Sequence, residues 1–319
     1  MNNRLGGFRA TLLIGWIVLG AAGLLYARSK GIPAWAAAPI LAAFLIEYSF
    51  YLVPGFEQVR ERLKRPGLPW LLACSAVLPY LVFALGTGQF QWDAAGKLAA
   101  LALVVSFWYV VLPPVPLADI GLLALLAWVL LRKFFDPIYP MPIPKLDVDI
   151  LGHLALIHVS AMALLIVRRV EGTGFGFLPR REDWAIGVRH YLYFLPVGLP
   201  LAWALGVFRF GGNTPAWKLA VTFIGILWVV ALSEEFFFRG LIQQWLVKWL
   251  GSAQWGLILT SVLFGMVHLG FRGFPNWRFA IVAAVAGWFY GRAYQQARSI
   301  RAGMVTHALV VTTWRALFA

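Results

Sequence analysis

Three short stretches in the last third of this 319-residue chain place ionisable side chains inside otherwise apolar sequence. The first, SEEFFFR, contains the adjacent glutamates Glu234 and Glu235, followed by Arg239. The other two supply one histidine each: His268 at the end of FGMVH, and His307 in THALVVTTWR. A charged side chain at the centre of a bilayer costs about 2.5–3.5 kcal/mol on insertion scales, so each of these groups needs a partner or a chemical task.

The spacing of the first stretch predicts which groups pair. On a helix Glu235 and Arg239 are four residues apart on one face, with the acid first, and this order favours an ion pair. Glu234 points about 100° away around the helix, so Arg239 does not serve both glutamates equally. A buried carboxylate without a partner makes a suitable general base, which we predict for Glu234. The alternative is that both glutamates only hold helices together.

The two histidines suggest what such a base would act on. Glu234, His268 and His307 lie on three predicted helices that can converge on one pocket. In a metal-free arrangement, Glu234 and His268 deprotonate a water that attacks a peptide carbonyl, while His307 donates to the oxyanion. In a second arrangement the same three residues ligate zinc, with water in the fourth position. We predict no cofactor, because HExxH and an acidic partner for the histidines are missing, but zinc stays open.

The remaining polar residues of the apolar stretches are expected to be structural. His153 and His158 are five residues apart, off a common helical face, and suit packing or an interface. Glu47 and Asp119 are isolated acids in the first 148 residues, which we expect to be scaffold or partner-docking helices. Serine catalysis is disfavoured, because Ser233 lies outside any GxSxG motif.

The composition predicts an all-α fold, a polytopic transmembrane helical bundle. The chain is 61% hydrophobic and only 13% charged, and apolar runs long enough to span hydrocarbon recur along it. We expect about 10–11 spans, with cores near 10–27, 34–53, 69–86, 98–112, 117–134, 149–167, 191–208, 219–246, 254–270, 277–296 and 302–318. The polar stretch 168–190 is predicted to form a short helix at the membrane surface.

The net charge of +14 is explained by topology rather than by nucleic acid, which we do not expect as a partner. Most Lys and Arg flank the apolar runs, where they orient helices and contact anionic lipid of the bilayer. Placing the N-terminus in the cytoplasm puts RERLKR (60–65) and the arginines of 168–190 on the cytoplasmic side, in accord with the positive-inside rule. The single cysteine, Cys74, excludes a disulfide within the chain and is expected to be a small buried residue.

The order EExxxR, FxxxH and a final histidine helix resembles the CPBP family, which includes type II CAAX prenyl endopeptidases and bacteriocin-processing or immunity proteins. The motifs here run from Glu234 to Arg239, from Phe264 to His268 and from His307 to Val311. The resemblance covers roughly 149–319, with FGFLPRREDW similar to the family's juxtamembrane segment. We therefore divide the chain into N-terminal accessory helices, 1–148, and a CPBP-like core, 149–319.

The resemblance implies a glutamate-type intramembrane endopeptidase of a bacterial inner membrane, acting on a membrane-anchored protein or hydrophobic peptide. It implies that Glu234 activates water with His268, that Glu235 and Arg239 support them, and that His307 helps to form the oxyanion site. The family usually has Asn where this chain has Val311, and valine cannot donate to an oxyanion. Two alternatives remain: a non-catalytic immunity-like or accessory protein of the same fold, which Val311 favours, and a proton-coupled transporter. A transporter is expected to show interrupted helices in two related halves, whereas here the polar residues gather in the last third.

Overall fold

The computed structural model describes residues 6–207, 211 and 214–317, and all regular structure within these residues is helical. The predicted all-α fold is confirmed, and each of the eleven expected apolar runs coincides with helix; their expected ends at 208 and 318 lie outside the described residues. Among the described residues, six helices are long and apolar enough to cross a membrane. This is fewer than the 10–11 expected spans, because α8, α13 and α14 are less apolar and α6 and α12 are short.

The chain forms two compact units, Met1–Val170 and Glu171–Ala319. The first consists of α1 (Gly6–Ser29), α2 (Ala34–Leu52), the 3₁₀ turn η2 (Val53–Gly55), α3 (Glu57–Arg62), α4 (Leu68–Gly86), α5 (Trp92–Val111), α6 (Pro116–Leu131), α7 (Ile150–Met162) and the π-helical η3 (Ala163–Val167). The boundary between the two units falls after Val170, 22 residues later than the boundary expected after residue 148. Helix α7 packs on α2, α4 and α5 and so belongs to the first unit.

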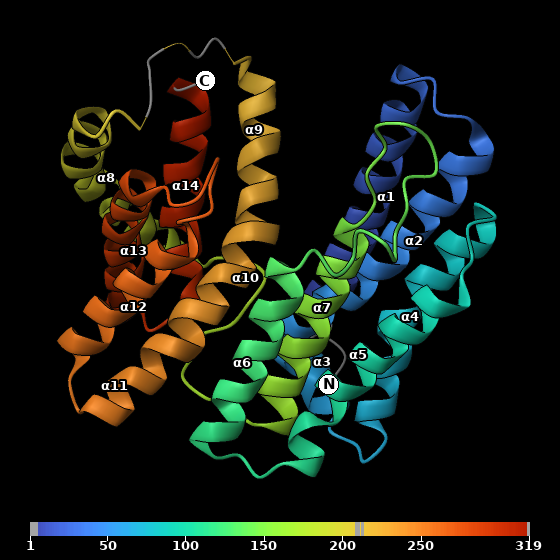
Figure 1. The fold of residues 1–319 in the computed structure, drawn as a ribbon, viewed down its shortest axis with the longest axis horizontal. Coiled ribbons are helices and arrows are strands. Elements are labelled where there is room, and N and C mark those ends of the chain that lie inside the picture. The colour runs from blue at the N-terminus through green and yellow to red at the C-terminus, as the bar shows by residue number, and fades with distance from the viewer. Residues whose placement is uncertain (1–5, 208–210, 212–213, 318–319) are drawn as a thin grey trace. The chain divides into compact units, whose positions relative to one another are not determined.

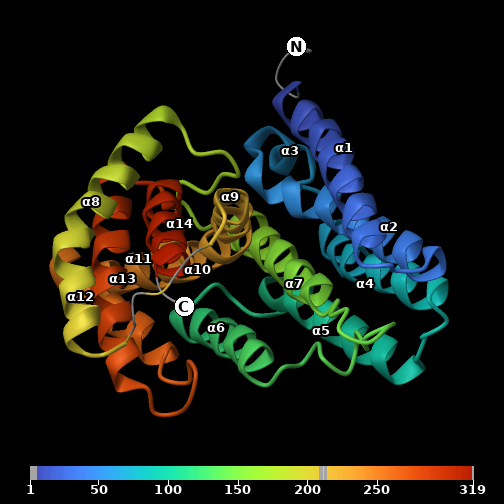
Figure 2. The same cartoon turned by 90° about the horizontal axis from the view of Figure 1, so that it is seen from above.

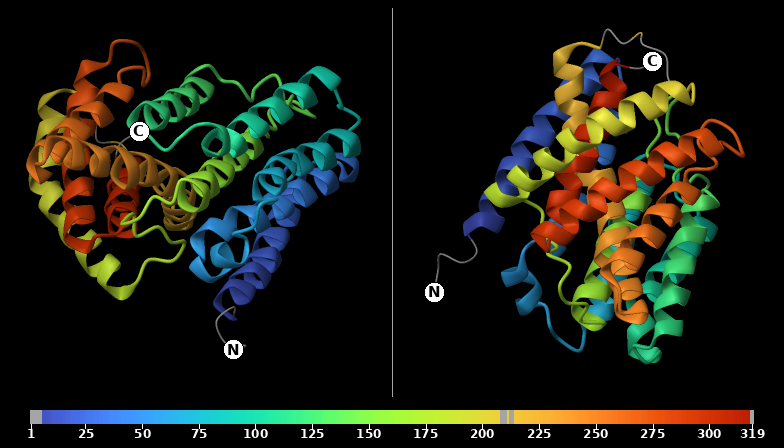
Figure 3. Two further views of the ribbon diagram at one scale, coloured as in Figure 1. Left: turned by 90° about the horizontal axis from the view of Figure 1, so that it is seen from below. Right: turned by 90° about the vertical axis from the view of Figure 1, so that its left-hand side faces the viewer.

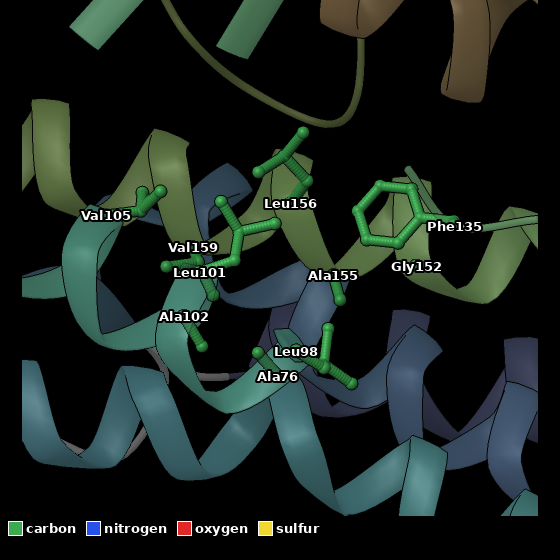
Figure 4. A pocket seen from close by; sticks show the side chains of 10 residues that line it. All are labelled: Ala76, Leu98, Leu101, Ala102, Val105, Phe135, Gly152, Ala155, Leu156 and Val159. Atoms are coloured by element: carbon green, nitrogen blue, oxygen red, sulfur yellow. The ribbon is translucent and has the colours of Figure 1, made fainter. Parts of the chain in front are cut away.

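Helix α4 is central to the first unit, since it packs on α2, α5 and α7 (Figures 1 and 2). Apolar side chains from α4, α5 and α7 fill the space between these helices (Figure 4). Gly152 lies directly under the ring of Phe135, where a Cβ atom would overlap the aromatic carbons. The missing side chain therefore lets the segment after α6 pack closely on α7.

The isolated acids of the first unit have partners distant in sequence. Asp119 accepts bonds from Nε and Nη2 of Arg168, at 2.8 and 2.9 Å, and from the Tyr109 hydroxyl at 2.8 Å. Glu47 is bonded to His158. Both acids are isolated in the sequence but are paired in the structure with groups from other helices.

The second unit consists of α8 (Arg181–Ala204), α9 (Ala216–Gly225), η4 (Ile226–Ala231), α10 (Leu232–Glu235), η5 (Phe236–Gln243), α11 (Gln244–Leu250), α12 (Ala253–Val267), α13 (Trp277–Ala297) and α14 (Ile300–Leu317). Helix α13 packs on α8, α12 and α14, and α14 also packs on the helix formed by α9 to η5 (Figure 3). Every element that carries a predicted site residue lies in this unit.

The expected surface helix over 168–190 is not a separate element. Residues 168–180 have no α-helix, and α8 begins at Arg181 and continues to Ala204. The start of α8 is fixed by Asp183, whose carboxylate accepts from the backbone N–H of Arg180 at 2.7 Å and pairs with Arg301 at 3.1 Å. The charged residues around Arg180 and Asp183, which suggested a helix at the membrane surface, therefore form the N-terminal cap of the long helix α8.

Candidate active site

The two adjacent glutamates lie on a single turn of α-helix between two π-helical segments. The helix is continuous over Ala216–Leu250, but η4 precedes α10 and η5 follows it. A π segment widens the turn and redirects the side chains that follow, and such segments are frequent at functional sites. Here they set the direction in which Glu234 and Glu235 leave the helix.

The ion pair expected from the spacing is present and fully buried. Arg239 Nη1 donates to Glu235 Oε1 at 3.0 Å, and neither side chain is exposed. The same Oε1 atom also lies 3.0 Å from Nδ1 of His307, 72 residues later in the chain. Because an ionised carboxylate only accepts, this contact places the His307 proton on Nδ1. Glu235 therefore joins its own helix to α14.

Arg239 is held by more than its carboxylate partner. Its Nη2 donates to the backbone carbonyl of Gly287 at 2.9 Å, and its guanidinium lies over the rings of Phe264 and Tyr290, at 4.6 and 5.3 Å. A guanidinium suits this position because its planar donors and its faces are used together. The groups that contact this buried positive charge therefore come from α10, α12 and α13.

His307 lies between the two glutamates. Its Nε2 is 3.9 Å from Glu234 Oε2, and its ring is stacked on Tyr290 with centroids 4.6 Å apart. With the proton on Nδ1, Nε2 of the neutral ring is a lone pair that accepts a hydrogen bond. The Glu234 side chain is 32% exposed, whereas that of Glu235 is 0% exposed. Glu234 is therefore the glutamate that a second molecule can reach.

Glu234 Oε2 is buried and has no hydrogen-bond partner among the described residues. The separation of 3.9 Å from Nε2 of His307 exceeds a direct hydrogen bond, so the two atoms are close without being bonded to each other. A buried acceptor of this kind is unusual in folded proteins, where most have a partner. Glu235 Oε2 and Arg239 Nε are also buried without a partner in the described residues, but of these three side chains only that of Glu234 is partly exposed.

His268 lies at the C-terminal end of α12 and contacts the ring of Phe264, which also contacts His307. Its Nδ1 is 2.7 Å from the backbone carbonyl of Phe264, which only accepts, so Nδ1 carries the proton and Nε2 is free. The Phe264 ring contacts His268 at 4.7 Å and His307 at 5.9 Å between centroids. No ion pair joins His268 to Glu234 in the part of the chain that the structure describes. The structure thus brings Glu234, Glu235, Arg239 and His307 into contact, and links His268 to them through Phe264.

The zinc arrangement has no support from the side-chain geometry. Within residues 6–207, 211 and 214–317, no group of three or more His, Cys, Asp or Glu residues is placed to hold a metal ion.

The position of the expected oxyanion donor is occupied by an apolar residue on α14. Val311, four residues after His307, is partly buried. Of the two threonines that follow, Thr313 is bonded to the Tyr191 hydroxyl at 2.7 Å, while the buried Thr312 hydroxyl has no partner in the described residues. Thr312 is therefore the hydroxyl on this turn that remains available for a new bond.

Tyr290, Gly287 and Gly303 contribute to the site and were not predicted. Tyr290 stacks on His307, Gly287 supplies a carbonyl to Arg239, and a Cβ atom on Gly303 would lie 2.6 Å from Glu235 Oε2. The sequence does contain a signal for Gly287, because Gly287 and Gly291 are four residues apart on α13. The Gly291 carbonyl accepts from Gln243 Nε2 at 3.4 Å, as that of Gly287 accepts from Arg239.

Comparison with known proteins supports this part of the chain as the functional one. Residues 216–313 match the family model described as type II CAAX prenyl endopeptidase Rce1-like. The match includes all three motifs and confirms the family resemblance drawn from them. The family that this segment resembles consists of CAAX-type membrane proteases, and together with the apolar helices the match supports an integral membrane protein. Neither the curated proteins nor the solved structures contain a match to the chain.

Proposed function

We propose that this protein is an intramembrane endopeptidase that hydrolyses a peptide bond in a membrane-associated or lipidated protein or peptide. The observation that carries the proposal is the partly exposed Glu234 side chain, whose Oε2 atom lies 3.9 Å from Nε2 of a buried histidine, within a segment that matches the Rce1-like family. The supporting groups, Glu235 and Arg239, keep that histidine in one orientation.

In the proposed reaction, a water molecule is bound by Glu234 and by Nε2 of His307. Glu234 takes a proton from this water as the hydroxide oxygen attacks the substrate carbonyl carbon, and later returns the proton to the leaving amine. Glu235 accepts from Nδ1 of His307, as the acid of a catalytic triad orients its histidine.

This division of roles differs from the one implied by the family resemblance, which paired Glu234 with His268 and gave His307 the oxyanion. A neutral His307 with its proton on Nδ1 has no donor to offer at Nε2. We therefore assign His307 to the water. We assign the oxyanion to His268, whose Nδ1 is also bonded to an acceptor and whose Nε2 donates once both ring nitrogens carry protons. No metal or other cofactor enters this mechanism.

The proposed setting is a bacterial inner membrane with the N-terminus in the cytoplasm. The run RERLKR at 60–65 contains the exposed Arg62, Lys64 and Arg65, and the positive-inside rule places such a run in the cytoplasm. The substrate reaches Glu234 as a segment anchored in the bilayer, and the lipid bilayer is the protein's other partner.

The test is cleavage of a quenched fluorescent peptide by the full-length protein in proteoliposomes. We use a farnesylated peptide with a CAAX terminus and the same peptide without the lipid. Glu234→Gln is expected to reduce turnover at least 100-fold, because a positioned general base contributes about 10²–10⁴ in rate. The control Glu182→Gln changes an exposed glutamate of α8 and is expected to keep full activity.

Cleavage that persists in Glu234→Gln would contradict the assignment of the base. If the wild-type protein cleaves neither peptide, the result favours the accessory-protein alternative, to which Val311 points.

A further inference from the structure

Three polar side chains from different helices meet in the interior of the first unit. His158 on α7 lies between Ser75 on α4 and Glu47 on α2. Its Nε2 is 2.9 Å from Ser75 Oγ, and its Nδ1 is 2.6 Å from Glu47 Oε1. All three residues are buried. The sequence did not indicate this cluster, because Glu47 and His158 are 111 residues apart and Ser75 has no GxSxG motif.

The order of these groups is that of an activated nucleophile. A hydroxyl, an imidazole within hydrogen-bond reach and an acid on the far ring nitrogen define a serine triad by geometry rather than by sequence motif. Glu47 accepts from Nδ1 of His158, which leaves Nε2 to receive the serine proton. The hydroxyl also lies 2.8 Å from the Leu72 carbonyl, and rotation about Cβ–Oγ turns its proton from that carbonyl to Nε2.

A large apolar cavity opens beside this cluster. Its volume is about 790 Å³, and both Ser75 and His158 line it. The rest of its lining is apolar apart from the thiol of Cys74, which is exposed and not buried as the sequence had suggested. Trp70, Leu71 and Leu78 form part of its wall and are themselves exposed, so the cavity opens on the apolar surface of the unit. Apolar pockets of 300–1,000 Å³ with a few convergent polar groups are typical ligand sites.

We propose that the first unit has a second catalytic site, in which Ser75 is the nucleophile toward a carboxylic ester with a long apolar acyl chain. The chain occupies the cavity and its ester carbonyl reaches Ser75. An ester fits because the cavity lining offers one hydroxyl, one imidazole and one thiol, with no fixed charge to receive an ionised group.

The proposed step transfers the acyl group to the serine. The Ser75 proton passes to Nε2 of His158 while Oγ bonds to the carbonyl carbon, and the ester C–O bond breaks as the alcohol leaves with that proton. A water molecule then hydrolyses the acyl-serine by the same base, releasing a carboxylic acid and restoring the hydroxyl. Glu47 is a positioning residue, since it contacts the histidine rather than the substrate.

The experiment treats the full-length protein in nanodiscs with a hexadecyl fluorophosphonate and locates the adduct by peptide mass spectrometry. We expect phosphonylation at Ser75 in the wild-type protein and in Glu234→Gln, because the two sites are separate. We expect no adduct at this position in Ser75→Ala, and a labelling rate at least tenfold lower in Glu47→Gln. The control Ser106→Ala removes a buried hydroxyl on α5 that has no hydrogen-bond partner in the described residues, and this variant is expected to label normally.

Two results would overturn the proposal: no adduct on Ser75 in the wild-type protein, or an unchanged labelling rate in Glu47→Gln. Thermal unfolding of each variant is measured in parallel, so that a lost adduct in a folded protein is separated from loss of fold. Hydrolysis of 4-nitrophenyl palmitate is expected to exceed that of 4-nitrophenyl acetate by at least tenfold, and equal rates would contradict an acyl chain in the cavity.

Discussion

The buried charge of Arg239 is compensated through two of its three guanidinium nitrogens. The guanidinium donates to a carboxylate and to a backbone carbonyl, and it is enclosed by aromatic rings. A buried ion pair of this kind contributes little net stability compared with apolar residues of the same volume, but removing one partner leaves the other charge uncompensated. The pair therefore orients His307 at low net cost while it is intact.

Arg239→Ala is expected to destabilise the protein by about 3–5 kcal/mol, because it leaves Glu235 buried without its cation. The measurement is the yield of folded protein together with thermal unfolding in detergent. The control Arg292→Ala removes an exposed arginine of α13 and is expected to have little effect. Adding Glu235→Gln to Arg239→Ala is expected to recover part of the loss, and normal stability of Arg239→Ala alone would contradict the role of the pair.

Val311 is the residue at which this chain departs from the family pattern that the motifs suggested. It follows His307 by one helical turn, so an amide there would point toward the same region as the imidazole. Val311→Asn is expected to raise kcat by up to about 100-fold, because a single oxyanion donor is commonly worth 10²–10³ in kcat. Val311→Leu serves as an apolar control. If the folded Val311→Asn protein cleaves at the wild-type rate, the valine lies away from the oxyanion.

At the scale of the elements, glycines allow α13 and α14 to approach η5 and α10 closely. Arg239 and Gln243, four residues apart, reach the carbonyls of Gly287 and Gly291, which are also four apart. Helix α14 approaches in the same way at Gly303, beside Glu235. Small residues at helix contacts permit such backbone approach in membrane proteins. The polar site thus depends on the positions of three helices.

Gly303→Ala tests this close approach. The new methyl group would lie 2.6 Å from Glu235 Oε2 and must displace either the carboxylate or α14, which carries His307. We expect a loss of about 1–3 kcal/mol in stability, as for other overpacked sites, and a lower kcat. The control Gly225→Ala adds a methyl group with nothing within 4 Å and is expected to be neutral or slightly stabilising. Equal behaviour of the two variants would show that α14 has room at Gly303.

Across the whole molecule, the helices and the local ion pair could be predicted from the sequence. Apolar runs set the helices, and the i, i+4 spacing gave the Glu235–Arg239 pair. The π-helical segments were not predictable, because one wider turn leaves the apolar pattern nearly unchanged. Contacts between distant helices were missed for a different reason. The bond from His307 to Glu235 joins residues 72 apart, and helical periodicity contains no information on which helices become neighbours.

The two compact units also differ in what the sequence revealed about them. The second contains the motifs of the family match, at 216–313, and its predicted site residues are close together or share Phe264. The first has no comparable motif, yet its interior contains the Ser75–His158–Glu47 cluster and the paired Asp119 and Arg168. Acidic residues are rare in this apolar unit, and its two buried acids, Glu47 and Asp119, each have a basic partner.

If Glu234 and His307 act on the same water, their contributions to catalysis are coupled, and a double-mutant cycle measures that coupling. Peptide cleavage in proteoliposomes is measured for wild type, Glu234→Gln, His307→Gln and the double variant. Residues that act as a unit are strongly non-additive, so the account predicts that the double variant is about as slow as the slower single variant. Losses that multiply in the double variant would contradict it, because the two side chains would then contribute independently.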